Sequence, residues 1–124
     1  FRYENMQCLL WGSQLGWVDP QTLMKPESKK EADFLKDMML FRRKQHDVLY
    51  GGRFMGEIIP KGDNPEWDIP GFGKSPVVRA AEWQSKDGKS VILVVNIDDN
   101  KHSVELPNGE KIEIKGLQCL RINQ

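Results

Sequence analysis

The sequence predicts an α+β fold, in which an N-terminal helical segment with one long helix packs on a C-terminal antiparallel β-sandwich of about six strands. Before Gly51 and Gly52, apolar residues recur at the three- and four-residue spacing of a helix face. After these glycines, short apolar runs alternate with turn signals, which is typical of antiparallel sheets. A length of 124 residues suits about one domain. We expect a helical segment over residues 1–52 and the sandwich over residues 53–124.

The chain begins with an apolar stretch that places Trp11 and Trp17 around a Gly-Ser-Gln-Leu-Gly turn. Residues 4–11 fit either a helix or a buried strand, because so short an apolar run has no decisive period. Exposed chain starts are usually polar and frayed, so we expect this start to be covered by the rest of a longer protein or by a second copy. Asp19 and Pro20 then predict a helix start, with Asp as the cap and Pro at the first position.

Residues 28–49 are expected to form one continuous helix that covers a sheet face. Ser28, followed three residues later by Glu31, fits a capping box. Basic residues gather near the end of the helix, where they suit its dipole. The side chains expected to cover the sheet are Leu35, Met38 and Met39.

The second half of the sequence supplies the expected strands, at residues 53–59, 77–85, 90–97, 102–106, 111–114 and 117–122. Residues 90–97 are almost continuously apolar, which predicts a central strand covered on both faces. Asp87 and Gly88 are a hairpin signal between two of these strands. Residues 61–76 are rich in Gly and Pro, and we expect a loop there without regular structure.

The composition excludes several classes of function. Lys and Arg number 18 and balance 18 Asp and Glu, so there is no excess positive charge to hold nucleic acid or an anionic membrane surface. No apolar run is long enough to span a bilayer. Cys8 and Cys119 are expected to be buried free thiols, with a disulfide as the alternative. Neither His46 nor His102 has a partner at ligand spacing, so we expect no metal and no cofactor.

Candidate chemistry is limited to contact with carbohydrate. Trp67 lies near Phe72 in the expected loop, where an exposed ring could stack on a sugar; the alternative is that both rings pin the loop to the sandwich. Trp83 lies in the middle of an expected strand and is assigned to the core. Glycosidase chemistry needs two carboxyl groups that face each other about 5–10 Å apart, and nothing in the spacing forces such a pair. No catalytic residue is assigned.

Three segments resemble the C-terminal end of large TIM-barrel glycoside hydrolases, with the α-galactosidase-like clan and its bacterial relatives as the nearest family. These segments are WGSQLGWVDPQTL, FLKDMMLFRRKQHDVLYGGRFMGEI and VVRAAEWQSKDGKSVILVVNI. In that family the last barrel helix stops at a Leu-Tyr-Gly motif, and a sandwich follows with a Trp-ended strand, an Asp-Gly hairpin and an apolar strand that closes on Asn. The corresponding positions here are Leu49-Tyr50-Gly51, Trp83, Asp87-Gly88 and Val95-Asn96.

The resemblance implies that a parent protein hydrolyses glycosidic bonds and that this chain is its C-terminal accessory portion, not catalytic by itself. Barrel active sites are built from loops that follow strands, so Gln14, Trp17 and Asp19 are the residues expected near substrate, with Trp67 as a further candidate. The implied partners are the N-terminal barrel of the parent or a second copy, and carbohydrate. A secreted or periplasmic parent fits this class. A free-standing carbohydrate-binding module and a protein-interaction domain stay open as alternatives.

Overall fold

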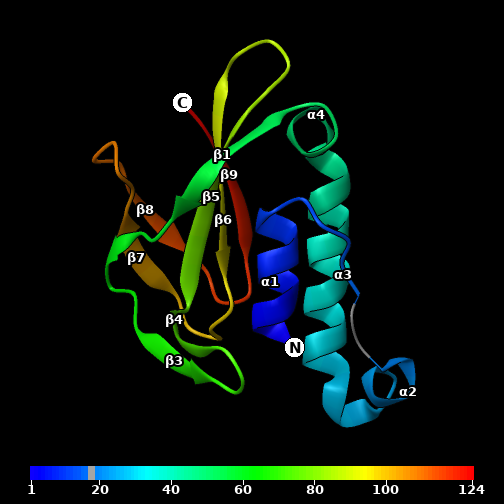
Figure 1. The fold of residues 1–124 in the computed structure, drawn as a ribbon. Helices are drawn as coiled ribbons and strands as arrows, with labels where there is room; N and C mark the ends of the chain where they lie inside the picture. Colours follow the sequence, from blue (N-terminus) through cyan, green and yellow to red (C-terminus); the bar gives the residue numbers. More distant parts are fainter. Residues whose placement is uncertain (17–18) are drawn as a thin grey trace.

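The structure, a computed structural model, describes residues 1–16 and 19–124. In this part of the chain the helices precede all of the strands (Figure 1). The helices are α1 (Arg2–Leu10), α2 (Pro20–Leu23), α3 (Lys29–Lys44) and α4 (His46–Leu49), with a 3₁₀ turn at Pro26–Ser28. The strands are β1 (Arg53–Ile58), β2 (Lys61–Gly62), β3 (Glu66–Ile69), β4 (Gly73–Pro76), β5 (Val78–Gln84), β6 (Ser90–Asn96), β7 (His102–Glu105), β8 (Lys111–Ile114) and β9 (Cys119–Asn123).

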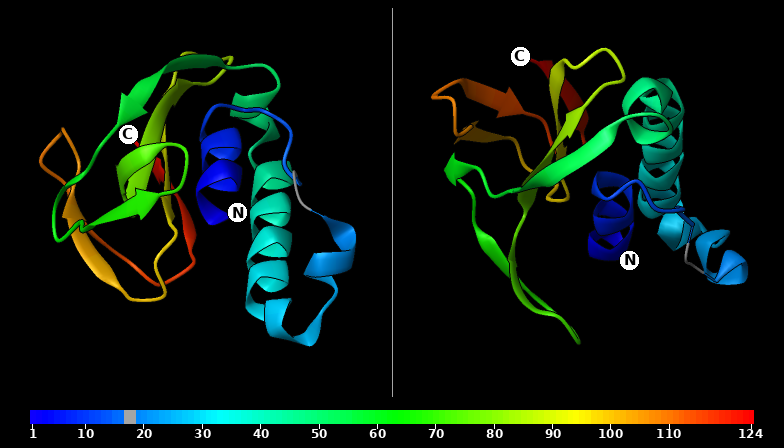
Figure 2. Two further views of the ribbon diagram at one scale, coloured as in Figure 1. Left: turned by 60° about the horizontal axis from the view of Figure 1, so that its bottom comes forward. Right: turned by 45° about the horizontal axis from the view of Figure 1, so that its top comes forward.

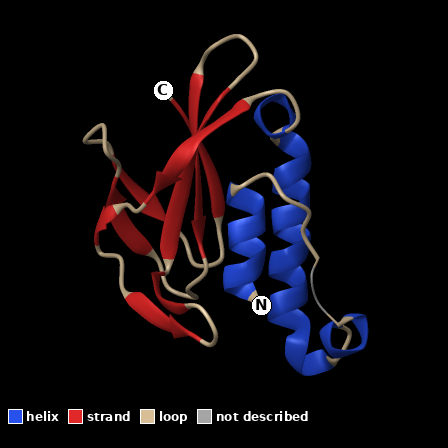
Figure 3. Cartoon of the chain, viewed as in Figure 1, coloured by secondary structure: helices blue, strands red, loops and turns tan. Residues whose placement is uncertain are grey.

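The elements form layers around a four-stranded antiparallel sheet with the order β1-β5-β6-β9. Helix α1 lies against β6 and against α3, and α3 also reaches β9, so the helices cover one face (Figures 1 and 2). The antiparallel trio β2-β7-β8 lies on the side away from the helices (Figure 3). The α+β prediction is confirmed, although the described residues hold nine strands rather than about six.

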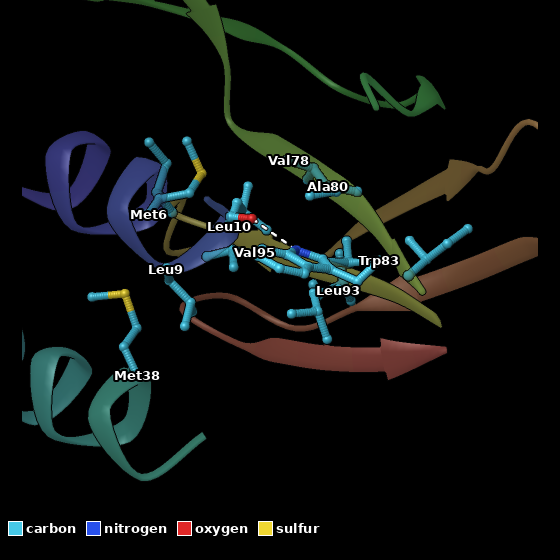
Figure 4. Packing of buried hydrophobic residues seen from close by; sticks show 14 of the residues in the cluster. Met6, Leu9, Leu10, Met38, Val78, Ala80, Trp83, Leu93 and Val95 are labelled. Atoms are coloured by element: carbon cyan, nitrogen blue, oxygen red, sulfur yellow. Dashed lines mark hydrogen bonds between the residues drawn. The ribbon is translucent and has the colours of Figure 1, made fainter. Parts of the chain in front are cut away.

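Strand β6 is the center of the molecule, as its apolar run predicts. It pairs with β5 on one side and β9 on the other, so Val94 lies between Ala80 and Leu120. From Val91 to Asn96 every residue is buried, on both faces of the strand. Helix α1 contributes Met6, Leu9 and Leu10 to the same core (Figure 4).

The N-terminal apolar stretch is a helix rather than a strand, and the core explains why. Met6, Leu9 and Leu10 recur at helical spacing and are fully buried. The indole nitrogen of Trp83 donates a hydrogen bond to the Leu10 carbonyl oxygen at 3.0 Å (Figure 4). This bond satisfies a carbonyl at the end of α1, which has no partner within the helix. Trp83 is therefore a core residue, as predicted.

The expected continuous helix over residues 28–49 is wrong, because the helix is interrupted at Gln45. Helix α3 ends at Lys44 and α4 begins at His46. The Gln45 backbone leaves the helical region, with φ −96° and ψ 21°. Its side chain is buried and accepts a hydrogen bond from Arg121 of β9 at 3.0 Å. After the break, α4 contacts β5 of the sheet.

The predicted capping box is also wrong, and so is the prediction that Met39 covers the sheet. Ser28 makes no side-chain capping bond, and Glu31 pairs instead with Arg2 of α1 at 2.7 Å. Leu35 and Met38 are buried as expected, whereas Met39 is 51% exposed. Met39 lies about 100° around the helix from Met38, which takes it off the buried face.

The expected loop at residues 61–76 contains three short strands, so that prediction is wrong as well. Strands β3 and β4 form a hairpin whose turn uses Gly71, with φ +83°. Asn64 holds the start of this hairpin, because its side-chain amide donates to the carbonyls of Pro60 and Val78 and its oxygen accepts from the Val78 nitrogen. The Gly and Pro residues mark the turns at the ends of the strands, not the absence of strands.

Neither cysteine forms a disulfide. Cys8 and Cys119 are both free and partly buried. Burial raises the pKa of the Cys119 thiol to about 12, and the Asp37 carboxylate adds to the increase. Burial, with a smaller contribution from Glu4, also raises the pKa of Cys8. Both groups are therefore neutral thiols near neutral pH and poor nucleophiles. Among the described helices, none has the length and apolar character needed to cross a membrane.

Candidate functional site

The candidate site is a hollow lined by residues of α3, of α4 and of the loop that follows α1. Figure 1 shows how this loop runs across α3. Its volume is about 500 Å³, within the roughly 300–1,000 Å³ that is usual for small-molecule sites. We call it the basic hollow. Its lining residues are Gln14, Leu15, Met39, Arg42, Arg43, His46 and Tyr50.

The wall supplied by the helices follows from helical spacing. Met39, Arg43 and His46 are four and then three residues apart, so they lie on the same side of the helix axis. Tyr50 follows His46 by one further turn, at the end of α4. The short break at Gln45 does not remove His46 or Tyr50 from this wall. The exposed Met39, expected to cover the sheet, is instead part of the hollow.

The opposite wall is a loop that buried polar groups hold in place. The side-chain oxygen of Asn5 accepts a hydrogen bond from the Gly16 nitrogen at 3.0 Å, and its amide donates to the Phe1 carbonyl. Asn5 is fully buried, so these bonds offset the cost of removing its amide from water. At the other end of the loop, the Ser13 nitrogen donates to the Cys8 carbonyl at 2.7 Å. Gln14 and Leu15 are therefore presented from an anchored loop.

The hollow concentrates positive charge. Arg42 and Arg43 line it together with His46, and none of the described residues that line it is acidic. Within the described residues, no ion pair joins either arginine to a carboxylate. Three other arginines of the chain are paired: Arg2 with Glu31, Arg79 with Glu57, and Arg121 with Asp47.

The Arg42 guanidinium has a fixed position and an unused donor. Its Nη1 donates to the Tyr50 hydroxyl, and the group lies over the Tyr50 ring, 5.1 Å from the ring centroid. Such stacking orients a guanidinium without neutralising it. The Nε atom of Arg42 is buried and has no hydrogen-bond partner among the described residues. A buried donor of this kind without a partner is uncommon in proteins.

The residues predicted to lie near substrate are Gln14, Trp17, Asp19 and Trp67. Gln14 lines the basic hollow, whereas Trp17 lies outside the described residues. Asp19 caps α2 as expected: it accepts from the Gln21 nitrogen at 3.2 Å and from the Thr22 hydroxyl at 2.8 Å.

Trp67 comes from the other end of the molecule, in β3. Its ring is partly buried and packs against the core, which agrees with the view that it pins this segment to the sandwich. The neighbouring Phe72 is 58% exposed, and its ring lies 5.0 Å from that of Tyr3. Contact of either ring with sugar stays a prediction.

The sequence did not indicate Arg42, Arg43, His46 and Tyr50 as a site. Their spacing along one helix face could have been noticed, because positions 39, 42, 43 and 46 follow the helical repeat. The contribution of Gln14 and Leu15 could not have been predicted from the sequence, because it depends on where the loop crosses α3.

A second polar network joins α1 to the sheet edge. Arg79 of β5 is buried; it forms an ion pair with Glu57 of β1 and donates to Gln7 of α1 at 2.9 Å. The indole nitrogen of Trp11 donates to Glu57 at 2.8 Å. The Trp11 ring lies 5.6 Å from that of Phe54, and both rings are partly exposed, at 50% and 38%. We call these two rings the Trp11 patch.

His102 forms an unexpected bridge between two carboxylates. Its Nδ1 lies 2.9 Å from Asp63 and its Nε2 lies 2.7 Å from Asp98. Burial lowers its pKa, but the hydrogen bonds to Asp63 and Asp98 raise it more, so the net shift is upward. Both ring nitrogens are occupied, and among residues 1–16 and 19–124 no three His, Cys, Asp or Glu side chains form a group suited to a metal ion.

Comparison with known proteins gives one informative relative. Over 122 residues the chain is 52% identical to a protein of Bacteroides thetaiotaomicron that carries the name "Putative glycoside hydrolase". The match covers 98% of this chain and 18% of that protein, so the chain spans less than a fifth of the relative's length. No family model and no solved structure matches the chain. The chain is thus related to part of a protein named as a glycoside hydrolase.

Proposed function

We propose that the chain serves as the C-terminal accessory portion of a glycoside hydrolase and that the catalytic carboxylates lie in the remainder of that enzyme. The observation that carries this proposal is the match at 52% identity to 18% of a protein named as a glycoside hydrolase. The α-galactosidase-like clan is the proposed family, on the motifs Leu49-Tyr50-Gly51 and Asp87-Gly88.

The position of the polar groups supports an accessory role. Several carboxylates of the chain are already paired with cations, including Glu57 with Arg79 and Asp47 with Arg121. Arg121 lowers the pKa of Asp47 through their hydrogen bond, which keeps this group ionised and unsuited to act as a general acid. The basic hollow has no lining carboxylate that could serve as a catalytic acid or nucleophile.

The Trp11 patch supports docking onto the remainder of the hydrolase. Trp11 and Phe54 are large apolar rings at the surface, and the Glu57 hydrogen bond holds the indole in place. Exposed aromatic rings with fixed orientation are frequent anchors of protein interfaces. The proposed partner is therefore the N-terminal barrel, with a second copy of the chain as the alternative.

The direct test uses the Bacteroides relative in three forms: full length, lacking the matched region, and the matched region alone. We expect turnover of aryl-glycosides by the full-length protein, a large loss without the matched region, and none from the matched region alone. Turnover by the chain alone that disappeared on changing one of its own carboxylates would overturn the proposal. So would unchanged turnover and thermal stability after removal of the region.

A further inference from the structure

We propose that the basic hollow binds an acidic saccharide through the carboxylate of a uronic acid unit. This inference rests on the proposed function, because it names the class of sugar that the hydrolase would meet at this surface. It is supported by the local charge, the donor geometry of two guanidinium groups, and the polar and apolar side chains that share the hollow.

The charge of the hollow selects for an anion. Arg42, Arg43 and His46 supply two permanent positive charges and one titratable group, and no lining residue is acidic. The whole chain has a formal net charge of zero, so this excess is local. Since no described carboxylate is paired with either guanidinium, an incoming anion would not have to displace an internal partner.

The type of cation favours a carboxylate in particular. A guanidinium presents its donors in a planar fork that fits a carboxylate with two parallel hydrogen bonds. Stacking on Tyr50 orients the plane of the Arg42 guanidinium beside the hollow. Arg43 lies on the adjacent helical position and is more exposed, which lets it reach the same ligand from the open side.

The remaining lining suits the rest of a sugar ring. Gln14 and Tyr50 carry groups that hydrogen-bond to hydroxyls, while Leu15 and Met39 offer apolar surface for the carbon face of a pyranose. A bare inorganic anion has no carbon face to contact Leu15 and Met39. The volume of about 500 Å³ also exceeds what such an ion needs.

The test measures binding to the folded 124-residue chain by calorimetry, at fixed ionic strength. The probes are trigalacturonate, its neutral counterpart galactotriose, and inorganic phosphate. We expect trigalacturonate to bind roughly tenfold or more tightly than galactotriose, because a charge-assisted bidentate contact is worth at least that ratio. Phosphate is expected to bind more weakly than trigalacturonate.

The matched variants are Arg43→Gln and Lys44→Gln. They remove the same charge from neighbouring positions of α3, but Lys44 does not line the hollow. Arg43→Gln should reduce trigalacturonate affinity toward that of galactotriose, whereas Lys44→Gln should leave it within about twofold. Circular dichroism of both variants checks that the fold is retained.

Several results would overturn the inference. Equal affinity for the acidic and neutral trisaccharides would exclude carboxylate recognition, and equal losses in the two variants would indicate only long-range charge. Phosphate binding as tight as that of trigalacturonate would mean an anion site without sugar recognition. Absence of trigalacturonate binding would also contradict the proposal. None of these results bears on turnover by the full-length relative, which tests the proposed function separately.

Discussion

His102 connects two turns of the chain through hydrogen bonds to their carboxylates. Its ring bridges Asp63, which follows β2, and Asp98, which follows β6. The ring itself is buried, while Asp98 is mostly buried and Asp63 is largely exposed. The sequence placed His102 on an alternating strand but gave no sign of its partners, because both lie in turns whose positions depend on the fold.

The raised pKa of His102 predicts a pH-dependent contribution to stability. A group whose pKa is higher in the folded state contributes stability below its unfolded pKa, about 6.5, and loses it as the pH rises through the folded pKa. We expect His102→Gln to lower the free energy of unfolding by about 1 kcal/mol more near pH 6 than near pH 9. Urea unfolding at both pH values measures this difference. Ser103→Ala, at an exposed position of the same strand, is the control and removes no ionisable group. A penalty for His102→Gln that is equal at both pH values would contradict the prediction.

At the scale of the element, α3 and the strands show what the sequence could and could not predict. The period of apolar residues was enough to identify α3, and the unbroken apolar run was enough to identify β6 as the central strand. Periodicity did not fix the edges of the buried face, since Met38 and Met39 differ only by their angle around the axis. It also missed the break at Gln45, which depends on the bond from Arg121. The helical wall of the basic hollow follows a local repeat, but its combination with Gln14 and Leu15, more than 20 positions earlier, was not visible in any local pattern.

Met38 and Met39 offer a matched test of the buried face of α3. Met38 is fully buried, and Met39 is half exposed on the wall of the hollow. Met38→Ala should cost roughly 2–5 kcal/mol in unfolding free energy through lost burial and an internal cavity. Met39→Ala should cost less than about 0.5 kcal/mol, as for an exposed helix position. Comparable penalties for the two variants, measured by chemical denaturation, would mean that α3 sits with a different face toward the core.

Val94→Ala tests the double coverage of β6. Val94 is fully buried between β5 and β9, so the change removes packing from a strand with no open face. We expect a loss of about 2 kcal/mol in unfolding free energy. Val104→Ala, at a buried position of the shorter strand β7, provides a comparison within the three-stranded sheet. A loss below about 0.5 kcal/mol at Val94 would indicate an open face or a collapsed site.

At the scale of the whole molecule, the helical part and the sheets share one core. Met6 and Leu9 of α1, Met38 of α3 and Leu93 of β6 belong to the same buried cluster (Figure 4). The proposed division at residue 52 therefore separates two kinds of secondary structure that bury each other's apolar faces. We expect neither half to be stable without the other, because each would expose the surface that the other covers. The Trp11 patch is among the apolar surfaces that the shared core leaves exposed.

The Trp11 patch can be tested as a docking surface for the remainder of the hydrolase. If it docks onto the barrel of the hydrolase, the 124-residue chain should associate with the remainder of the Bacteroides relative when the two are produced separately. Trp11→Ser should weaken this association by about tenfold or more, since a truncated aromatic anchor typically costs at least 1–2 kcal/mol. Met24→Ser, at a position that is 85% exposed and away from the patch, should leave it unchanged. Sedimentation of the two polypeptides together and alone measures the effect.

Self-association of the chain that is lost in Trp11→Ser would assign the patch to a second copy. Equal effects of the two variants would show that the patch is not a docking surface.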